Sequence, residues 1–227
     1  MTGVRRFLSL NSLSLAFGAL FLATLVGQAF AGAADVNDQR LSEGLEPISL
    51  GRFVTSSSFA VDVMENWQSE YLQFFLYVFA TVYLVQLGSA ESKEVHETGT
   101  ETDEEQQVGE YAEHDSPAWV RAGGWRTTVF SRSLGFVMGA LFLLTWAASS
   151  IAGWSAFNNE QLRGHEDPVS WLGYLGHADF WNRTLQNWQS EMLAVGSMAI
   201  FSVYLRQRGS PESKPVGAAH RDTGETG

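Results

Sequence analysis

Apolar residues in this chain are gathered into long blocks that polar residues separate. The first block covers residues 13–31 and the third covers residues 134–153, and at about 1.5 Å per residue each spans roughly 28 Å, close to the thickness of a bilayer core. The second and fourth blocks, at residues 71–87 and 192–205, form the later parts of longer helical patterns. This segregation predicts an all-α integral membrane protein with four transmembrane helices.

The same pattern occurs twice. The motif Asn-Trp-Gln-Ser-Glu stands at residues 66–70 and 187–191, and Gly-Ser-x-Glu-Ser-Lys stands at 88–93 and 209–214. A shift of 121 positions aligns both motifs without a gap, so the sequence predicts a tandem duplication of a two-helix hairpin. The expected parts are a first membrane unit at 1–93, an acidic disordered cytoplasmic linker at 94–118, a second membrane unit at 119–214 and a disordered tail at 215–227.

The first apolar block has two interpretations. Arg5 and Arg6 precede it and small residues end it, an arrangement that is also typical of a secretory signal peptide. Its counterpart at 134–153 ends in a similar way deep inside the chain, where no signal peptide can lie. We therefore expect an uncleaved helix, with cleavage after Ala31 as the alternative.

Basic residues predict the orientation of the hairpins. Lysines and arginines precede the first block, lie between the second and third, and follow the fourth, whereas the hairpin loops hold only four: Arg40, Arg52, Arg163 and Arg183. The positive-inside rule then places the N-terminus, the linker and the C-terminus in the cytoplasm and the hairpin loops outside it. Both hairpins run in the same direction, so they are parallel repeats.

Glu70 and Glu191 are the sharpest candidates for chemistry. Each ends its copy of the five-residue motif, where we expect a helix to enter the hydrocarbon, and a carboxylate there is costly to desolvate. If the two helices meet, amide and indole side chains would share one outward-facing polar site with the glutamates. The plainer interpretation is an interfacial belt that solvates the helix entry. The candidate polar site consists of Asn66, Trp67, Gln68, Glu70, Asn187, Trp188, Gln189 and Glu191.

Charge and composition argue against several classes of partner and chemistry. The net charge of −11 argues against a nucleic-acid partner, and a chain without Cys has neither disulfides nor thiolate chemistry. No catalytic motif, nucleotide-binding loop or metal-ligand cluster stands out, so we expect no enzyme, no cofactor and no metal. The expected partners are the lipid bilayer and either a second copy or another membrane protein.

Three function classes follow. We expect a structural or interaction role, as an accessory protein of the cell envelope. The alternative is a small transporter or channel that uses Glu70 and Glu191. A membrane enzyme ranks last, because nothing nucleophilic accompanies the two carboxylates. The second repeated motif, at 88–93 and 209–214, is expected to end a helix and to anchor it with a cytoplasmic lysine.

With these motifs and duplicated spans in view, the chain resembles a family of small bacterial membrane proteins that is defined as a domain of unknown function. The resemblance rests on the two Asn-Trp-Gln-Ser-Glu motifs and on Gly-Ser-Pro-Glu-Ser-Lys at residues 209–214. It covers nearly the whole chain except the acidic linker. It implies a multi-pass protein of the bacterial inner membrane and carries over no activity and no site.

Overall fold

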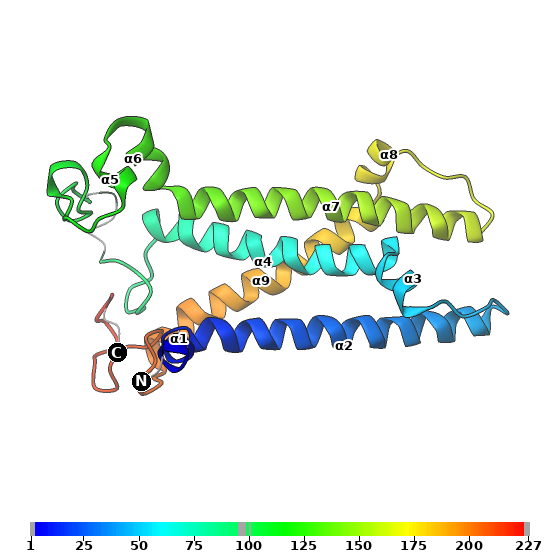
Figure 1. Cartoon of the computed structure of the whole chain (residues 1–227), viewed down its shortest axis with the longest axis horizontal. Coiled ribbons are helices and arrows are strands. Elements are labelled where there is room, and N and C mark those ends of the chain that lie inside the picture. The colour runs from blue at the N-terminus through cyan, green and yellow to red at the C-terminus, as the bar shows by residue number, and fades with distance from the viewer. Residues whose placement is uncertain (1–2, 95–98, 100, 225–227) are drawn as a thin grey trace. The chain divides into compact units, whose positions relative to one another are not determined.

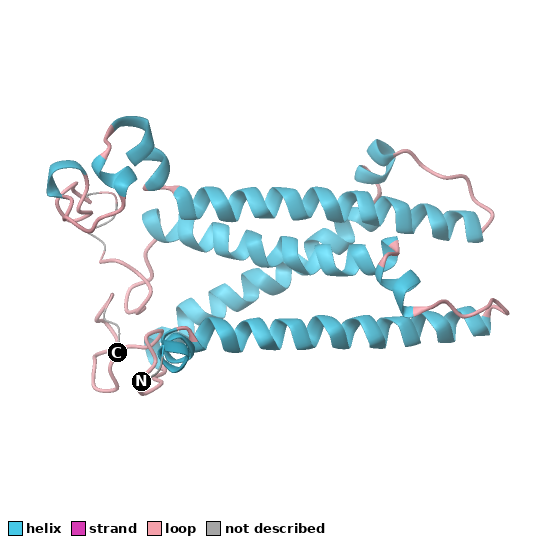
Figure 2. Cartoon of the chain, in the orientation of Figure 1, coloured by secondary structure: helices cyan, strands magenta, loops and turns pink. Residues whose placement is uncertain are grey.

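The fold is all-α over residues 3–94, 99 and 101–224, which are the residues that this computed structural model describes; helices and loops, without a strand, make up this part of the chain (Figure 2). Figure 1 shows the elements in chain order. They are α1 (Gly3–Leu10), α2 (Ser12–Ser42), α3 (Leu50–Val54), α4 (Ser57–Tyr83), a 3₁₀ turn (Gly109–Tyr111), α5 (Ala118–Arg121), α6 (Gly124–Phe130), α7 (Ser133–Arg163), α8 (Trp171–Leu175) and α9 (Ala178–Tyr204).

Helix bounds recur at the shift that aligns the two sequence motifs. Ser133, which begins α7, lies 121 residues after Ser12, which begins α2, and both helices contain 31 residues. The short helices α3 and α8 stand at the same spacing, and so do the 27-residue helices α4 and α9. Ser49 caps α3 with its side chain and Ser170 caps α8 in the same way, so local capping agrees as well.

Two helices of the described chain, α2 and α7, are long and apolar enough to cross a membrane. Only 6% of the most apolar stretch of α2 is buried, and only 22% of that of α7. A core helix of a water-soluble protein would be mostly buried, so these two helices expose apolar surface that needs another cover. The other two predicted spans, α4 and α9, do not meet the same criterion.

The chain divides into two compact units. The first consists of Met1–Val63 with Ile151–Pro168, and the second consists of Met64–Ser150 with Val169–Gly227. Helices α4 and α7 each continue from one unit into the other.

Within the first unit, α2 packs against α3. The side chain of Phe53 is 2% exposed, and a Cβ atom added to Gly32 would lie 2.7 Å from the Phe53 ring, so only glycine lets the two helices approach this closely. The side chain of Asn37 pairs with the backbone of Ile48 in both directions, at 3.0 Å and 2.7 Å. These contacts fold the chain after α2 back onto the helix.

Helices α2 and α7 run about ten residues beyond residues 31 and 153, where their apolar blocks end, so the polar residues that follow each block are helical as well. The two helices end in the same way. Gly44 and His165 occupy the left-handed region, with φ of 73° and 61°, and the next backbone N–H bonds back to the last turn in both copies.

Because α2 and α7 end in the same conformation, substitutions at Gly44 and His165 should change the stability in opposite directions. Glycine adopts left-handed backbone freely, whereas a Cβ atom there costs about 1 kcal/mol. Gly44→Ala should therefore lower the free energy of unfolding by about 1 kcal/mol, and His165→Gly should raise it by about 0.5 kcal/mol. Thermal unfolding in detergent, followed by circular dichroism, measures both changes, and shifts of the same sign would contradict the shared geometry.

Candidate functional site

The two copies of Asn-Trp-Gln-Ser-Glu contact each other in the second unit, where α4 carries one copy and α9 carries the other. The indole Nε1 of Trp188 donates a hydrogen bond to the side-chain oxygen of Gln68 at 2.9 Å. The hydroxyl of Ser69 donates to Glu191 at 3.2 Å. These two bonds join α4 to α9 midway along both helices.

The contact is not symmetric. Gln68 and Ser69 of the first copy are 0% and 2% exposed, whereas their counterparts Gln189 and Ser190 are exposed. Ser190 instead bonds to the backbone of its own helix, at 2.8 Å. The first copy therefore supplies the buried amide and hydroxyl, and the second copy supplies the indole and the carboxylate.

The other predicted site residues lie around this contact. Glu70 is exposed and close enough to Glu191 for their charges to interact. Asn187 donates to the backbone oxygen of Arg183 at 2.9 Å, within its own helix. Trp67 is half-buried, and Asn66 and Gln189 are exposed. The structure thus brings Gln68, Trp188, Glu191 and Glu70 together.

The side-chain amide of Gln68 is buried, and only one of its two polar atoms has a hydrogen-bond partner among the described residues. Its oxygen accepts from Trp188, but its nitrogen has no hydrogen-bond partner among the described residues. A buried donor without a partner costs about 1–3 kcal/mol. The bond from Trp188 therefore meets only part of the hydrogen-bonding requirement of this amide.

Aromatic rings hold Trp188 in place. Its ring centroid lies 5.7 Å from that of Trp146 and 6.1 Å from that of Phe142, both on α7. Trp146 also contacts the rings of Phe180 and Trp181, at 6.0 Å and 6.3 Å. Each close aromatic pair stabilises packing by about 0.5–1.5 kcal/mol beyond the burial of its area. This cluster fixes the direction in which the Trp188 indole donates.

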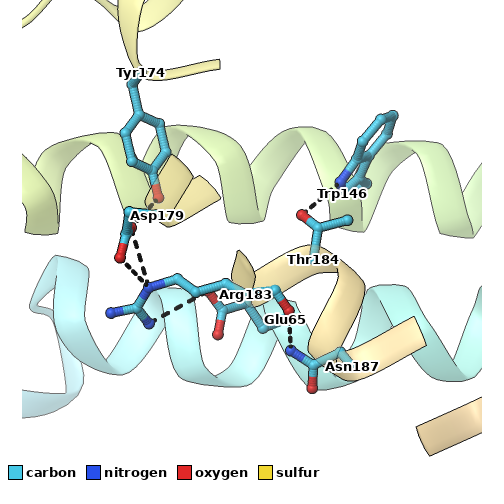
Figure 3. A network of polar contacts seen from close by, with 7 residues as sticks. All are labelled: Glu65, Trp146, Tyr174, Asp179, Arg183, Thr184 and Asn187. Atoms are coloured by element: carbon cyan, nitrogen blue, oxygen red, sulfur yellow. Dashed lines mark hydrogen bonds and ion pairs between the residues drawn. The ribbon is translucent and has the colours of Figure 1, made fainter. Parts of the chain in front are cut away.

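A charged network lies toward the N-terminal end of α9 (Figure 3). Arg183 pairs with Asp179 one turn earlier, at 3.2 Å, and with Glu65 of α4, at 3.5 Å. The hydroxyl of Tyr174, from α8, donates to Asp179 at 3.0 Å. Three helices of the second unit are therefore joined by one run of polar contacts.

The network also bears on the protonation of Tyr174, which lies on the short helix α8. Burial, followed by the charge of Asp179, raises the pKa of the Tyr174 hydroxyl. Tyr174 therefore keeps the proton that it donates to Asp179.

A polar cavity of about 440 Å³ opens beside this network. Six residues line it: Glu65, Asp179, Asn182, Arg183, Gln186 and Asn187. Neither this cavity nor a second one of about 510 Å³ elsewhere in the unit has Glu70 or Glu191 in its lining. The part of the chain that the structure describes also holds no group of three His, Asp or Glu residues arranged to bind a metal.

Several residues of the site are absent from the predicted set. Ser69 belongs to the repeated motif, so the repetition of this motif was a signal by which Ser69 could have been included in the predicted site. Asp179 and Arg183 are four residues apart on one helix, a spacing that favours an ion pair. Nothing in the sequence pairs Glu65 with Arg183 or Trp146 with Trp188, because those contacts depend on how the helices pack.

Comparison with known proteins adds a family to this geometry. No curated protein and no solved structure matches the chain. One family model, described as a domain of unknown function (DUF6766), matches residues 4–225. The match covers nearly the whole chain, and the protein therefore belongs to the DUF6766 family.

Proposed function

We propose that this DUF6766 protein is a non-enzymatic, multi-pass protein of the bacterial inner membrane with a structural or interaction role in the cell envelope. In this proposal the chain is a tandem duplication of two parallel hairpins. Helices α2, α4, α7 and α9 cross the bilayer, and the contact between the two copies of Asn-Trp-Gln-Ser-Glu joins the repeats. The protein then acts as a scaffold that presents its loops on both sides of the membrane.

The hydrogen bonds between the motifs carry this proposal. Gln68 and Ser69 are buried against α9, and their polar atoms bond to Trp188 and Glu191. A site that binds and releases a solute needs polar groups that face a cavity, whereas these groups face each other. The contact thus accounts for Gln68 and Ser69 in the first copy and for Trp188 and Glu191 in the second.

Exposed apolar side chains support the four spans. Leu20 of α2 and Leu144 of α7 are 60% and 67% exposed. Phe79 of α4 and Leu193 of α9 are 56% and 69% exposed, although those two helices also carry polar residues. Apolar surface on this scale, spread over four helices of 27 or 31 residues, suits a lipid environment.

Transport is the second candidate, favoured by the charge interaction between Glu70 and Glu191. A pair of carboxylates just before the apolar stretches of α4 and α9 could take up a cation or a proton. Purified protein in liposomes distinguishes the two functions. The scaffold proposal expects no proton or cation flux above that of empty liposomes, and a flux that Glu70→Gln with Glu191→Gln abolishes would establish transport instead.

A double-mutant cycle tests the contact between the motifs. Trp188→Phe removes the donor to the buried Gln68 oxygen and should lower the free energy of unfolding by about 1–3 kcal/mol. Once Gln68→Leu has removed the acceptor, the same substitution should cost about 1 kcal/mol less. Gln189→Leu, at the exposed counterpart, is the matched control and should change stability by less than about 0.5 kcal/mol. Strictly additive effects of Gln68→Leu and Trp188→Phe would contradict the contact.

The absence of native Cys allows a direct test of topology. Glu43→Cys and Glu166→Cys place a thiol in each hairpin loop, and Glu113→Cys and Val216→Cys place one in the linker and in the tail. All four positions are exposed. A membrane-impermeant thiol reagent should label only the two loop variants in intact spheroplasts, and all four after permeabilisation. Labelling of the linker variant from outside would overturn the proposed orientation.

A further inference from the structure

The short helices α5 and α6 form a folded corner at residues 117–132, directly before the long apolar helix α7; we call this segment the basic corner. The hydroxyl of Thr127, on α6, donates to the carbonyl of Trp119, on α5, at 2.8 Å. The indole rings of Trp119 and Trp125 meet edge to face, with their centroids 5.9 Å apart. These contacts hold the two short helices against each other and give the corner a defined surface.

Large apolar side chains are exposed on the basic corner. Trp119 and Trp125 are 45% and 66% exposed, and Val129 and Phe130 of α6 are exposed as well. A cluster of exposed apolar side chains marks a surface that contacts a partner or a membrane. Tryptophan in particular is enriched where a membrane meets water, because its ring is apolar and its N–H is polar.

Positive charge accompanies these apolar side chains. Arg121, Arg126 and Arg132 are exposed, and residues 117–132 contain neither Asp nor Glu, although the whole chain has a net charge of −11. In the part of the chain that the structure describes, none of the three arginines forms an ion pair with a carboxylate. The Arg126 guanidinium lies 5.8 Å from the centre of the Trp125 ring, so charge and aromatic surface are adjacent.

The donors of these arginines suit an anionic oxygen ligand. Arg121 donates to the His114 carbonyl at 3.2 Å, and Arg132 donates to the Thr128 carbonyl at 3.5 Å. A guanidinium carries five N–H donors, so a single bond to a carbonyl leaves most of them for another acceptor. Their planar fork matches the geometry of a phosphate group. The basic corner therefore has the chemistry of a surface that binds phosphate.

The position of the basic corner in the chain indicates where that phosphate comes from. Helix α7 begins at Ser133, next to Arg132, and is one of the two described helices that are long and apolar enough to cross a membrane. When a helix crosses a bilayer, the residues just before it lie at the level of the lipid headgroups. The preceding residues 101–115 are rich in Glu and Asp, which a layer of phosphates repels, so the corner and not this stretch would face the bilayer.

A similar short helix precedes the other long apolar helix. Helix α1 begins at Gly3 and α6 begins at Gly124, which is again a spacing of 121 residues. Figure 1 shows each short helix turned away from the line of the long helix that follows it. Both have an apolar residue before an arginine and another apolar residue four positions after the first: Val4, Arg5 and Leu8 in α1, and Trp125, Arg126 and Val129 in α6. Arginine beside exposed apolar side chains thus precedes both α2 and α7.

We propose that the basic corner binds the headgroups of anionic phospholipids at the bilayer surface. Arg121, Arg126 and Arg132 contact the phosphates, and Trp119 and Trp125 lie in the interfacial layer beside them. This inference rests on the membrane-spanning role proposed above and adds a class of lipid to it. Binding fixes the start of α7 at one surface of the bilayer, and in the proposed orientation that surface faces the cytoplasm.

Spin-labelled lipids measure the headgroup preference of the full-length wild-type protein in phosphatidylcholine vesicles. Electron paramagnetic resonance separates lipid held at the protein from lipid that diffuses freely. Phosphatidylglycerol should associate about fivefold more strongly than phosphatidylcholine, the factor expected of one arginine near the surface. Both lipids carry a phosphate, but choline cancels its charge, so the comparison isolates net charge. Salt at about 1 M shortens the screening length to about 3 Å and should reduce the preference.

Variants assign the preference to the basic corner. Changing its three arginines together to glutamine should bring the association of phosphatidylglycerol close to that of phosphatidylcholine, whereas changing them to lysine should keep most of the preference. A control variant removes the same charge at three other exposed arginines and should keep the wild-type preference. Its substitutions are Arg52→Gln, Arg163→Gln and Arg221→Gln.

A milder variant covers the case in which the triple glutamine variant fails to fold. Arg121→Gln with Arg132→Gln keeps the contact between Arg126 and Trp125 and should lower the preference by about twofold or more. The proposal is overturned if the wild-type protein shows no preference for phosphatidylglycerol, or if the folded variants of the corner keep the wild-type preference.

Membrane extraction separates this inference from the membrane-spanning role on which it rests. Alkaline carbonate releases proteins that only adhere to a membrane and leaves spanning proteins in place. Release of the wild-type protein would contradict the membrane-spanning role itself. Retention without a headgroup preference would overturn the lipid-binding proposal alone.

Discussion

The side-chain amide of Gln68 has no contact with solvent, so every polar atom on it must find a partner inside the protein or remain unpaired. Its oxygen is bonded by Trp188 from the other repeat, and its nitrogen is unpaired among the described residues. Two further features of the second unit surround this bond. The aromatic cluster around Trp146 orients the indole, and the bond from Ser69 to Glu191 joins the helices one residue further along.

The two copies of Asn-Trp-Gln-Ser-Glu have different surroundings because they pack against each other in a single contact. In the first copy the amide and hydroxyl are enclosed, and in the second copy they are exposed while the indole and carboxylate turn inward. After each of these helices, the two copies of Gly-Ser-x-Glu-Ser-Lys instead form equivalent turns, in which Ser92 and Ser213 accept from equivalent backbone N–H groups. One repeated motif thus makes a contact between unlike residues, and the other makes the same local turn twice.

Much of the fold is predictable from the spacing of the repeated motifs. The shift of 121 residues found in the motifs recurs in the bounds of three pairs of helices, because equivalent sequences meet equivalent capping residues. Hydropathy alone places the ends of α2 and α7 too early, since it registers the apolar span and not the polar turns that continue to Ser42 and Arg163. Helices α2 and α7 are long and apolar enough to cross a membrane, and the crossing of the bilayer by all four helices stays a prediction.

The candidate site was predictable only in part. Glu191, Gln68 and Trp188 belong to the repeated motif, and repetition drew attention to them. The sequence predicts that Lys214 is an exposed cytoplasmic anchor, whereas the structure buries it. Its ammonium group donates to three backbone carbonyls in the tail, a segment for which the sequence predicts disorder. Residues 225–227, and residues 95–98 and 100 of the predicted disordered linker, lie outside the described residues. Contacts such as that of Trp188 with Gln68 join residues whose pairing depends on tertiary packing, which local pattern does not encode.

The central claim is that the two motifs meet with Ser69 against Glu191, and chemical cross-linking tests it most directly. Ser69→Cys with Glu191→Cys can be compared, in the membrane, with the counterpart pair Ser190→Cys with Glu70→Cys, using a short bifunctional thiol reagent on a chain that has no other Cys. The structure predicts rapid intrachain cross-linking of the first pair, whose native side chains are 3.2 Å apart, and slower cross-linking of the second, whose members are exposed. Failure of the first pair to cross-link, or faster reaction of the second, would contradict the account.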